Sequence, residues 1–309
     1  MLKDTFTLVA GDGVELFVYR WLPDVSCRAV VQVAHGLAEH AGRYARLAEA
    51  LTGAGYGVYA NDHRGHGQTC RSRDELGSFG RPNGWLLCLD DLWKVNRQIA
   101  GEHPGTPIIL LGHSMGSAMA QQFMSERGHA LAGVVLSGPS GSPTALATVA
   151  RRILKLERLR LGPEGRSRLA SGLSFGAFNK QFNPARTAFD WLSRDPAEVD
   201  KYVADPLCGF SATVQLWIDF LDGWAAASTP QHRSRIPKNL PIYLIAGGRD
   251  PVSSNTKQIV PMLEAWRAAG LSKIQHRFYP EARHELFNET NRDEVTRDLI
   301  EWMDGVLGK

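Results

Sequence analysis

The chain contains the stretch IILLGHSMG, from Ile108 to Gly116, in which an apolar run leads into a serine flanked by glycines. Ile108–Leu111 predicts a buried strand, and Met115–Arg127 has the length of a helix with no proline inside it. A turn this tight requires small residues beside Ser114, and it exposes the serine hydroxyl above the edge of a sheet. The helix that follows favours negative charge at its start. The stretch predicts a nucleophilic serine, and the alternative is a glycine-rich turn with an incidental serine.

Short apolar runs alternate with helical patterns on both sides of this stretch. The apolar runs are Ala29–Ala34, Gly57–Asn61, Gly133–Ser137, Ile242–Ala246 and Gln275–Tyr279. The helical patterns are Arg43–Gly53, Trp85–His103, Asn255–Ala269 and Arg292–Leu307. This alternation predicts an α/β protein with a mostly parallel sheet and helices on both faces.

A hairpin pattern comes before these runs. Thr5–Ala10 and Val14–Trp21 are rich in strand formers, and Gly11-Asp12-Gly13 between them predicts a tight turn. The hairpin would add antiparallel strands at one edge of the sheet. Together with the serine on its strand–turn–helix junction, the pattern predicts the α/β-hydrolase fold.

The alternation stops between about Pro139 and Lys238, where the pattern becomes mainly helical. An excursion of roughly a hundred residues between two strands is too long for a simple crossover. We therefore predict a helical cap, residues 139–238, inserted between two parts of an α/β-hydrolase core, residues 1–138 and 239–309.

The composition agrees with a globular protein. Of the 309 residues, 43% are hydrophobic and 22% are charged, which excludes a disordered or fibrous chain. No apolar run reaches the roughly 18 residues of a membrane span, and no apolar signal segment follows Met1. The four cysteines are scattered without a CxxC pair. These features predict a soluble, cytoplasmic protein, and a net charge of +3 is too small to indicate a nucleic-acid partner.

A serine hydroxyl becomes a good nucleophile only when a positioned base takes its proton. In the α/β-hydrolase fold the order along the chain is serine, acid, histidine. Asp250 ends the turn Gly247-Gly248-Arg249-Asp250 directly after the run Ile242–Ala246. His284 lies in the loop between the last predicted strand and the last predicted helix. We therefore predict Asp250 as the acid and His284 as the base for Ser114.

Alternatives exist for both residues. Asp250 precedes Pro251 and could form a simple Asx turn, while His284 could be a surface histidine. Of the other nine histidines, seven precede Ser114 or end the helix behind it, His232 is at the cap boundary, and His276 lies inside a strand. Some hydrolases of this fold place the acid one strand earlier, but Ser137-Gly138-Pro139-Ser140 contains no carboxylate.

The run that ends at Ala34 leads through His35 and Gly36 into Leu37. In this fold, the loop after that strand and the residue after the nucleophile each supply a backbone N–H to the oxyanion hole. Those residues are Leu37 and Met115. No metal or cofactor is required by this chemistry.

Two polar segments follow. Glu39, His40 and Arg43 are candidates for contact with the polar group of a substrate, and the alternative is an exposed Glu39–Arg43 pair at a helix start. His63 and His66 are spaced like a pair of metal ligands. Because no third ligand stands at a suitable spacing, we interpret that segment as a structural turn.

These segments resemble a known family. They are His35-Gly36-Leu37-Ala38-Glu39-His40, Gly42-Arg43-Tyr44, Asp62-His63-Arg64-Gly65-His66-Gly67, the pentapeptide Gly112–Gly116, the Gly247–Asp250 turn and the His284 loop. The chain is similar in them to the monoacylglycerol lipase and lysophospholipase-like serine hydrolases. The resemblance implies hydrolysis of single-chain acyl esters, with the cap shaping an acyl tunnel. Some members of this group carry peptidase labels, so the resemblance leaves open whether the substrate is an ester or a peptide.

The same residues also leave other functions open. A general carboxylesterase, lysophospholipase, thioesterase, lactonase or peptidase could use this triad. A hydrolase fold retained as a binding protein is the main non-enzymatic alternative, and the complete triad argues against it.

One cap segment is strongly basic. Arg151, Lys155 and Arg158 are spaced to form one stripe of a helix, and the pattern places Leu146, Val149, Ile153 and Leu156 on the opposite side. A basic amphipathic helix can lie on an anionic membrane surface. The sequence therefore suggests peripheral membrane contact through the cap, and the alternative is a cap helix with a solvated basic face.

Overall fold

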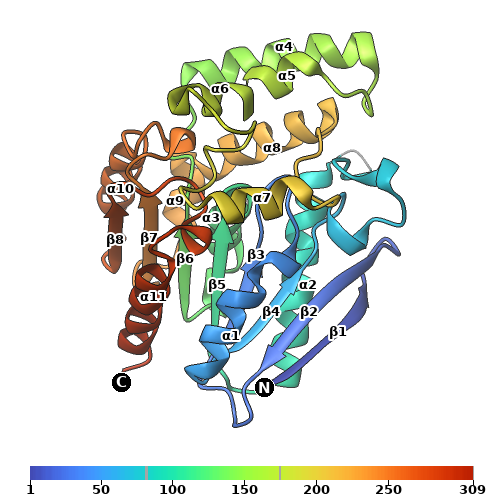
Figure 1. Ribbon diagram of the computed structural model, residues 1–309. Helices are drawn as coiled ribbons and strands as arrows, with labels where there is room; N and C mark the ends of the chain where they lie inside the picture. Colours follow the sequence, from blue (N-terminus) through green and yellow to red (C-terminus); the bar gives the residue numbers. More distant parts are fainter. Residues whose placement is uncertain (81–82, 174, 309) are drawn as a thin grey trace.

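The computed structural model describes residues 1–80, 83–173 and 175–308, and an eight-stranded sheet lies at its centre (Figure 1). Across the sheet the strands are β1 (Leu2–Val9), β2 (Glu15–Leu22), β4 (Gly57–Asn61), β3 (Val30–Ala34), β5 (Ile108–His113), β6 (Gly133–Ser137), β7 (Ile242–Gly247) and β8 (Ile274–Tyr279). The strands from β4 to β8 are parallel, and the β1–β2 hairpin joins β4 antiparallel. The predicted fold class and the predicted edge hairpin are confirmed.

Helices cover both faces of the sheet because alternate residues of its strands point to opposite sides. Ile108 and Leu110 of β5 share one hydrophobic cluster with the helices of the first face, while Ile109 and Leu111 share another with those of the second face. The first face carries α2 (Gly84–Glu102), α3 (Met115–Arg127) and α10 (Ile259–Ala268). The second face carries α1 (Ala45–Gly53) and α11 (Arg292–Val306).

One predicted helix start is wrong. Helix α10 begins at Ile259 rather than near Asn255, because Ser254, Asn255 and Thr256 have φ angles of 53°, 55° and 67°. A left-handed run cannot belong to a right-handed helix. The segment after Asp250 therefore forms a turn before the helix begins.

The chain between β6 and β7 forms helices and contributes no strand to the sheet in its described part. These helices are α4 (Ala145–Leu161), α5 (Arg168–Leu173), α6 (Phe175–Asn179), α7 (Pro196–Ala204), α8 (Val214–Ala227) and α9 (Pro230–Arg235). In Figure 1, α4, α5 and α6 form the top layer, and α8 lies between them and the sheet. Helix α8 packs on both α4 and α3, and its Trp217 and Trp224 belong to the same hydrophobic cluster as Leu110. The inserted helices therefore share a core with the sheet.

The turn at Ser114 depends on backbone groups that approach one another closely. Ser114 has a φ of 52° and a ψ of −116°, a conformation that side-chain-bearing residues rarely adopt. A Cβ atom on Gly112 would lie 2.3 Å from the carbonyl oxygen of Gly116, and one on Gly116 would lie 2.0 Å from that of Ala34. Both positions require glycine, because backbone atoms that cannot move aside occupy the space that a side chain would need.

We expect Gly116→Ala to lower the free energy of unfolding by at least about 2 kcal/mol, because its methyl group would collide with the carbonyl of Ala34. Gly101→Ala in α2 is the matched control, since no atom lies within 4 Å of its Cβ position. The control should be neutral or slightly stabilising. Urea denaturation of both variants measures the difference, and equal effects would contradict the close-approach argument.

Candidate active site

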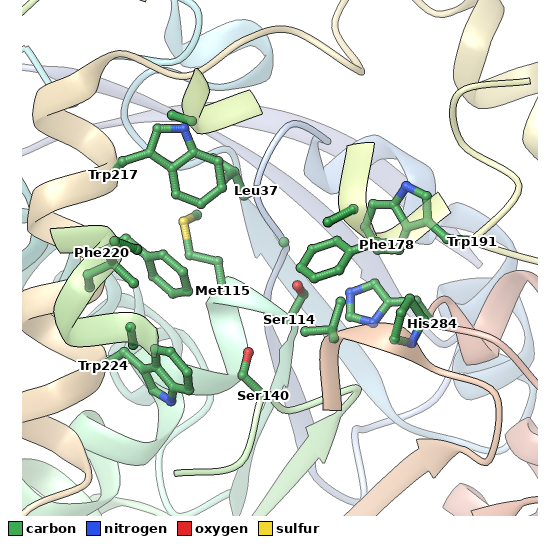
Figure 2. Close-up of a pocket in the computed structure, with 18 of the residues that line it drawn as sticks. Leu37, Ser114, Met115, Ser140, Phe178, Trp191, Trp217, Phe220, Trp224 and His284 are labelled. Carbon is green, nitrogen blue, oxygen red and sulfur yellow. The ribbon is translucent and has the colours of Figure 1, made fainter. Parts of the chain in front are cut away.

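Ser114 is placed at the carboxyl end of β5 by the strained turn. Its backbone N–H donates to the carbonyl of Ser137 at 3.0 Å, which ties the turn to the neighbouring strand β6. The Ser114 side chain lines a cavity between the sheet and the inserted helices, and His284 lines the same cavity (Figure 2). The predicted nucleophile and base are thus brought to one place from positions far apart in the chain.

Asp250 and His284 form a buried pair. His284 Nδ1 lies 2.9 Å from Asp250 Oδ2, and the side chains are 2% and 0% exposed. Asp250 Oδ1 also accepts the backbone N–H of Val252 at 2.9 Å. The Asx turn and the acid–histidine pair were alternatives from sequence, and the structure contains both.

The hydrogen bond to a carboxylate means that Nδ1 of His284 carries the proton. His284 Nε2 is buried and has no hydrogen-bond partner among the described residues. This nitrogen therefore keeps a free lone pair beside Ser114, as a general base requires.

The inserted segment helps to hold the histidine loop. The backbone N–H groups of His284 and Glu285 donate to the carbonyls of Trp191 and Leu192, at 3.4 and 2.8 Å. The Trp191 ring packs on the imidazole with 5.1 Å between centroids. A Cβ atom at Gly138 would lie 3.1 Å from Cε1 and Nδ1 of His284. The histidine thus occupies the space at the end of β6.

Nearby charges set the protonation of the two histidines at the site. Burial lowers the pKa of His284, but the charge of Asp250 and its hydrogen bond, with Glu285 and Glu39, outweigh burial and raise the pKa above its ordinary value. His113 lies next to it, with 4.8 Å between ring centroids. Burial, together with His284, lowers the pKa of His113 to about 4, so this ring stays neutral.

The two predicted oxyanion donors lie at the same cavity. Leu37 and Met115 both line it, and their backbone N–H groups have no protein acceptor in the described part of the chain. His35 braces the loop before Leu37: its Nε2 accepts the N–H of His63 at 3.0 Å, so its Nδ1 donates to the carbonyl of Gly36 at 2.8 Å. The loop is therefore held by the side chain of His35, and the N–H of Leu37 keeps no protein acceptor among the described residues.

The cavity measures about 450 Å³ and is mainly apolar. Its apolar walls come from α4 and α8, with Phe178 and Trp191 on the side of His284 (Figure 2). The wall residues of α4 and α8 are Leu146, Ala147, Ala150, Ile153, Leu154, Trp217, Phe220, Leu221 and Trp224. Leu146 is 75% exposed although it lines the cavity, so the mouth lies beside the first turn of α4.

The predicted substrate-binding residues are separated by the structure. Glu39 lines the cavity, whereas His40 and Arg43 do not. Arg43 Nη1 and Glu39 Oε2 form the i,i+4 pair at 2.8 Å, but the side chains are only 11% and 5% exposed. The alternative of an exposed pair is wrong, because the rest of the fold covers it. His40 Nε2 lies 2.9 Å from Asp205 Oδ2 of the inserted segment.

Two histidine-containing groups bear on metal binding. His63 and His66 are fully buried against His35, and burial lowers their pKa to about 3 and about 4, so they are neutral packing residues within a turn. The ligand atoms of His40, Asp205 and Cys208 lie within 4.8 Å of one another. Burial raises the pKa of the Cys208 thiol, which keeps it protonated and a poor metal ligand.

The predicted basic amphipathic helix is α4, and much of its apolar side is exposed. Leu146, Val149 and Leu156 of α4 are 75%, 49% and 68% exposed, and of the four predicted apolar residues only Leu146 and Ile153 line the cavity. Arg151, predicted in the basic stripe, pairs with Asp222 of α8. The outer surface of α4 therefore carries apolar and basic side chains together.

Glu285 is the site residue that sequence reasoning missed. It directly follows His284, lines the cavity, and binds Arg43 through two hydrogen bonds of 2.6 Å. A charged residue directly after the predicted base could have indicated a role for Glu285 in the site. Its partner Arg43 could not be predicted, because it lies 242 residues away along the chain.

This arrangement defines a serine hydrolase with the α/β-hydrolase fold. The model of the serine aminopeptidase S33 family matches residues 26–291, and the chain belongs to this family. Human monoglyceride lipase is 30% identical over 94% of this chain and 89% of its own length. The monoacylglycerol lipase of Mycolicibacterium smegmatis is 31% identical over 95% of each chain. The predicted family resemblance is confirmed: the protein is a monoacylglycerol lipase-like serine hydrolase.

A solved structure agrees with this assignment. A thermostable carboxyl esterase from Bacillus coagulans, solved in complex with glycerol, matches with a TM-score of 0.90 and 26% identity, covering 99% of both chains.

Proposed function

We propose that the protein hydrolyses monoacylglycerols and similar single-chain acyl esters through an acyl-enzyme on Ser114. The observation that carries the proposal is the apolar cavity that has Ser114 and His284 on its wall and its mouth beside α4. Hydrolysis of a carboxylic ester needs a nucleophile, a base and an oxyanion site. The residues that we propose for these roles all line this cavity.

In the first step, His284 Nε2 takes the proton of Ser114 while the serine oxygen attacks the acyl carbonyl carbon. The carbonyl oxygen becomes negative and accepts hydrogen bonds from the N–H groups of Leu37 and Met115, each worth about 10²–10³ in rate. Asp250 stabilises the imidazolium through Nδ1. His284 then protonates the leaving alcohol, and water repeats the sequence on the acyl-enzyme.

The cavity suits one acyl chain with a small uncharged head. Its volume of about 450 Å³ lies in the range of small-molecule pockets, and its length is lined by apolar and aromatic side chains. The relatives named monoglyceride and monoacylglycerol lipase support the same substrate class.

A peptidase role is the second candidate because the family carries an aminopeptidase name. An aminopeptidase needs an unpaired carboxylate to bind the free α-amino group of its substrate. The acidic residues that line the described cavity are Glu39, Glu157 and Glu285, and each is bound by an arginine. Because each of these carboxylates already accepts a hydrogen bond from an arginine, the geometry favours esters over aminoacyl amides.

Ser114→Ala should lower kcat by roughly 10⁴–10⁶ while the protein remains folded, since the nucleophile is lost and the cavity is kept. Hydrolysis of a p-nitrophenyl ester measures the rate. Labelling with a fluorophosphonate probe should disappear in the same variant. Retention of more than a tenth of the wild-type rate would show that another residue attacks the ester.

For substrates, we expect kcat/KM for a medium-chain monoacylglycerol to exceed that for the matching triacylglycerol by at least about tenfold, or roughly 1.4 kcal/mol of transition-state binding. A cavity covered by α4 and α8 has space for one chain and not for three. An aminoacyl amide should be cleaved more slowly than either glyceride. The measurement is kcat/KM of the purified protein on the monoacylglycerol, the triacylglycerol and the amide. Equal values for the two glycerides, or a higher value for the amide, would contradict the proposed substrate class.

We further propose that the protein is cytoplasmic and contacts an anionic membrane surface through α4. No helix in the described ranges is long and apolar enough to cross a bilayer. Leu156 and Leu159 of α4 are 68% and 86% exposed, and Arg152 and Lys155 lie exposed on the same helix. Apolar and basic side chains on one surface helix are the combination that binds an anionic interface. The cavity mouth at Leu146 lies on this helix, so docking would bring the mouth to a lipid substrate.

The double variant Leu156→Ser/Leu159→Ser should bind vesicles of phosphatidylcholine and phosphatidylserine at least tenfold more weakly than wild type. Arg152→Gln/Lys155→Gln should lose a similar amount, at roughly 1 kcal/mol per basic side chain, and only on vesicles that contain phosphatidylserine. Val25→Ser is the control. Val25 is 69% exposed, and it lies in the loop between β2 and β3, at the end of the sheet opposite to the cavity. Co-sedimentation measures binding, and equal binding by all four proteins would contradict docking through α4.

A further inference from the structure

Arg43 joins the two loops that carry the reaction. Its Nη1 donates to Glu39 Oε2 at 2.8 Å in the loop after β3, and its Nη1 and Nη2 donate to Glu285 Oε1 and Oε2 at 2.6 Å each in the loop after β8. The three side chains are buried from solvent. Neither contact follows from the hydrolysis mechanism itself.

We propose that Arg43, Glu39 and Glu285 form a positioning bridge that sets the distance between the oxyanion loop and His284 and keeps a net negative charge beside the imidazole. This inference rests on the proposed hydrolysis through Ser114. It assigns to Glu39 and Arg43 a role behind the reacting atoms instead of contact with a substrate head group.

The geometric part of the bridge begins at Glu39. Its Oε1 accepts the backbone N–H of Gly36 at 2.6 Å and the hydroxyl of Tyr44 at 3.0 Å. Gly36 immediately precedes Leu37, whose N–H is one of the two proposed oxyanion donors. A shift of Glu39 would therefore move the peptide that aims this donor.

The other end of the bridge reaches the base. Glu285 is the neighbour of His284 in the chain, and its own N–H is held by the carbonyl of Leu192 at 2.8 Å. Cζ of Arg43 lies 4.8 Å from the centroid of the Tyr202 ring, and this cation–π contact orients the plane of the guanidinium. Oxyanion donor and base are thus linked by a chain of charge-assisted hydrogen bonds, which are strong and directional.

The electrostatic part follows from the count of charges. Two carboxylates surround one guanidinium, so the bridge carries a net charge of −1. Burial raises the pKa of the Glu285 carboxyl, but Arg43 opposes burial and lowers it to about 2, so the carboxylate stays ionised. A negative charge in a site shielded from water stabilises the imidazolium that His284 becomes during catalysis.

The groups that face His284 are few. Asp250 bonds its Nδ1, Glu285 and Glu39 lie beyond the ring, and His113 beside it is neutral. The Trp191 ring also packs against the imidazole, with 5.1 Å between centroids, and adds no charge. Removing the Glu285 charge therefore leaves Asp250 as the dominant charge on the base.

The test is the pH dependence of kcat/KM on p-nitrophenyl butyrate in Glu285→Gln. Hydrolysis requires neutral His284, so the rate falls as pH drops through its pKa. Loss of the negative charge lowers that pKa, and the acid limb should move to lower pH by about half a unit or more. We also expect kcat at the plateau to fall about tenfold with KM nearly unchanged. If Glu285→Gln does not fold, Glu39→Gln removes the other carboxylate charge and should shift the limb in the same direction.

Glu289→Gln is the matched control. Glu289 is a fully buried glutamate of the same loop, but it binds Arg194 and the N–H of Arg283 and does not line the cavity. This variant should lower the melting temperature and leave the acid limb in place. An unmoved limb in Glu285→Gln, or an equal shift in Glu289→Gln, would overturn the charge role.

Arg43→Lys separates geometry from charge, since lysine keeps the positive charge but lacks the two-pronged fork. We expect kcat to fall about tenfold or more with the acid limb unmoved and KM within twofold. A wild-type kcat in this variant would overturn the positioning role. If hydrolysis through Ser114 is itself wrong, Ser114→Ala will keep the wild-type activity. That outcome does not depend on the pH profile of Glu285→Gln, so the two failures can be told apart.

Discussion

The left-handed backbone of Ser114 is the constraint on which the site depends. A non-glycine residue with φ near 52° is unfavourable unless its surroundings hold it there. Here the hold comes from the close approach of Gly112 and Gly116 to neighbouring backbone and from the hydrogen bond between the Ser114 N–H and β6. The turn places Ser114 and Met115 together on the wall of the same cavity. One local distortion therefore places both the proposed nucleophile and a proposed oxyanion donor.

Much of the core could be predicted because its signals are local. A continuous apolar run predicts a buried parallel strand, and β4, β6 and α3 have the predicted limits. The positions of Asp250 and His284 were predictable because the fold places functional groups after particular strands. The start of α10 was missed, since Asn255 resembles a helix cap in sequence and only the backbone shows the left-handed turn.

Long-range contacts could not be predicted in the same way. The pairing of Arg43 with Glu285 and of His40 with Asp205 joins segments more than a hundred residues apart, and no single-sequence pattern encodes such partners. The surroundings of α4 could not be predicted either, because the part of a helix that is covered depends on which distant segments pack against it. In the structure, part of the apolar surface is exposed, and the cavity takes only one side of the helix.

The contacts of Trp191 and Leu192 with the histidine loop have a consequence for how this architecture can change. The backbone that supports His284 belongs to the segment between β6 and β7 rather than to the sheet, so the proposed insertion would be part of the proposed catalytic framework as well as a cover. The upper helices α4 and α5 could be exchanged or could rearrange to admit different chains, because neither carries these two carbonyls, whereas Asn179 at the end of α6 accepts the backbone N–H of Trp191. Replacing the whole segment as a cassette would instead remove the support of the base. Diversification of specificity in this architecture should therefore concentrate in the first half of the insertion, while the stretch around Trp191 stays structurally invariant.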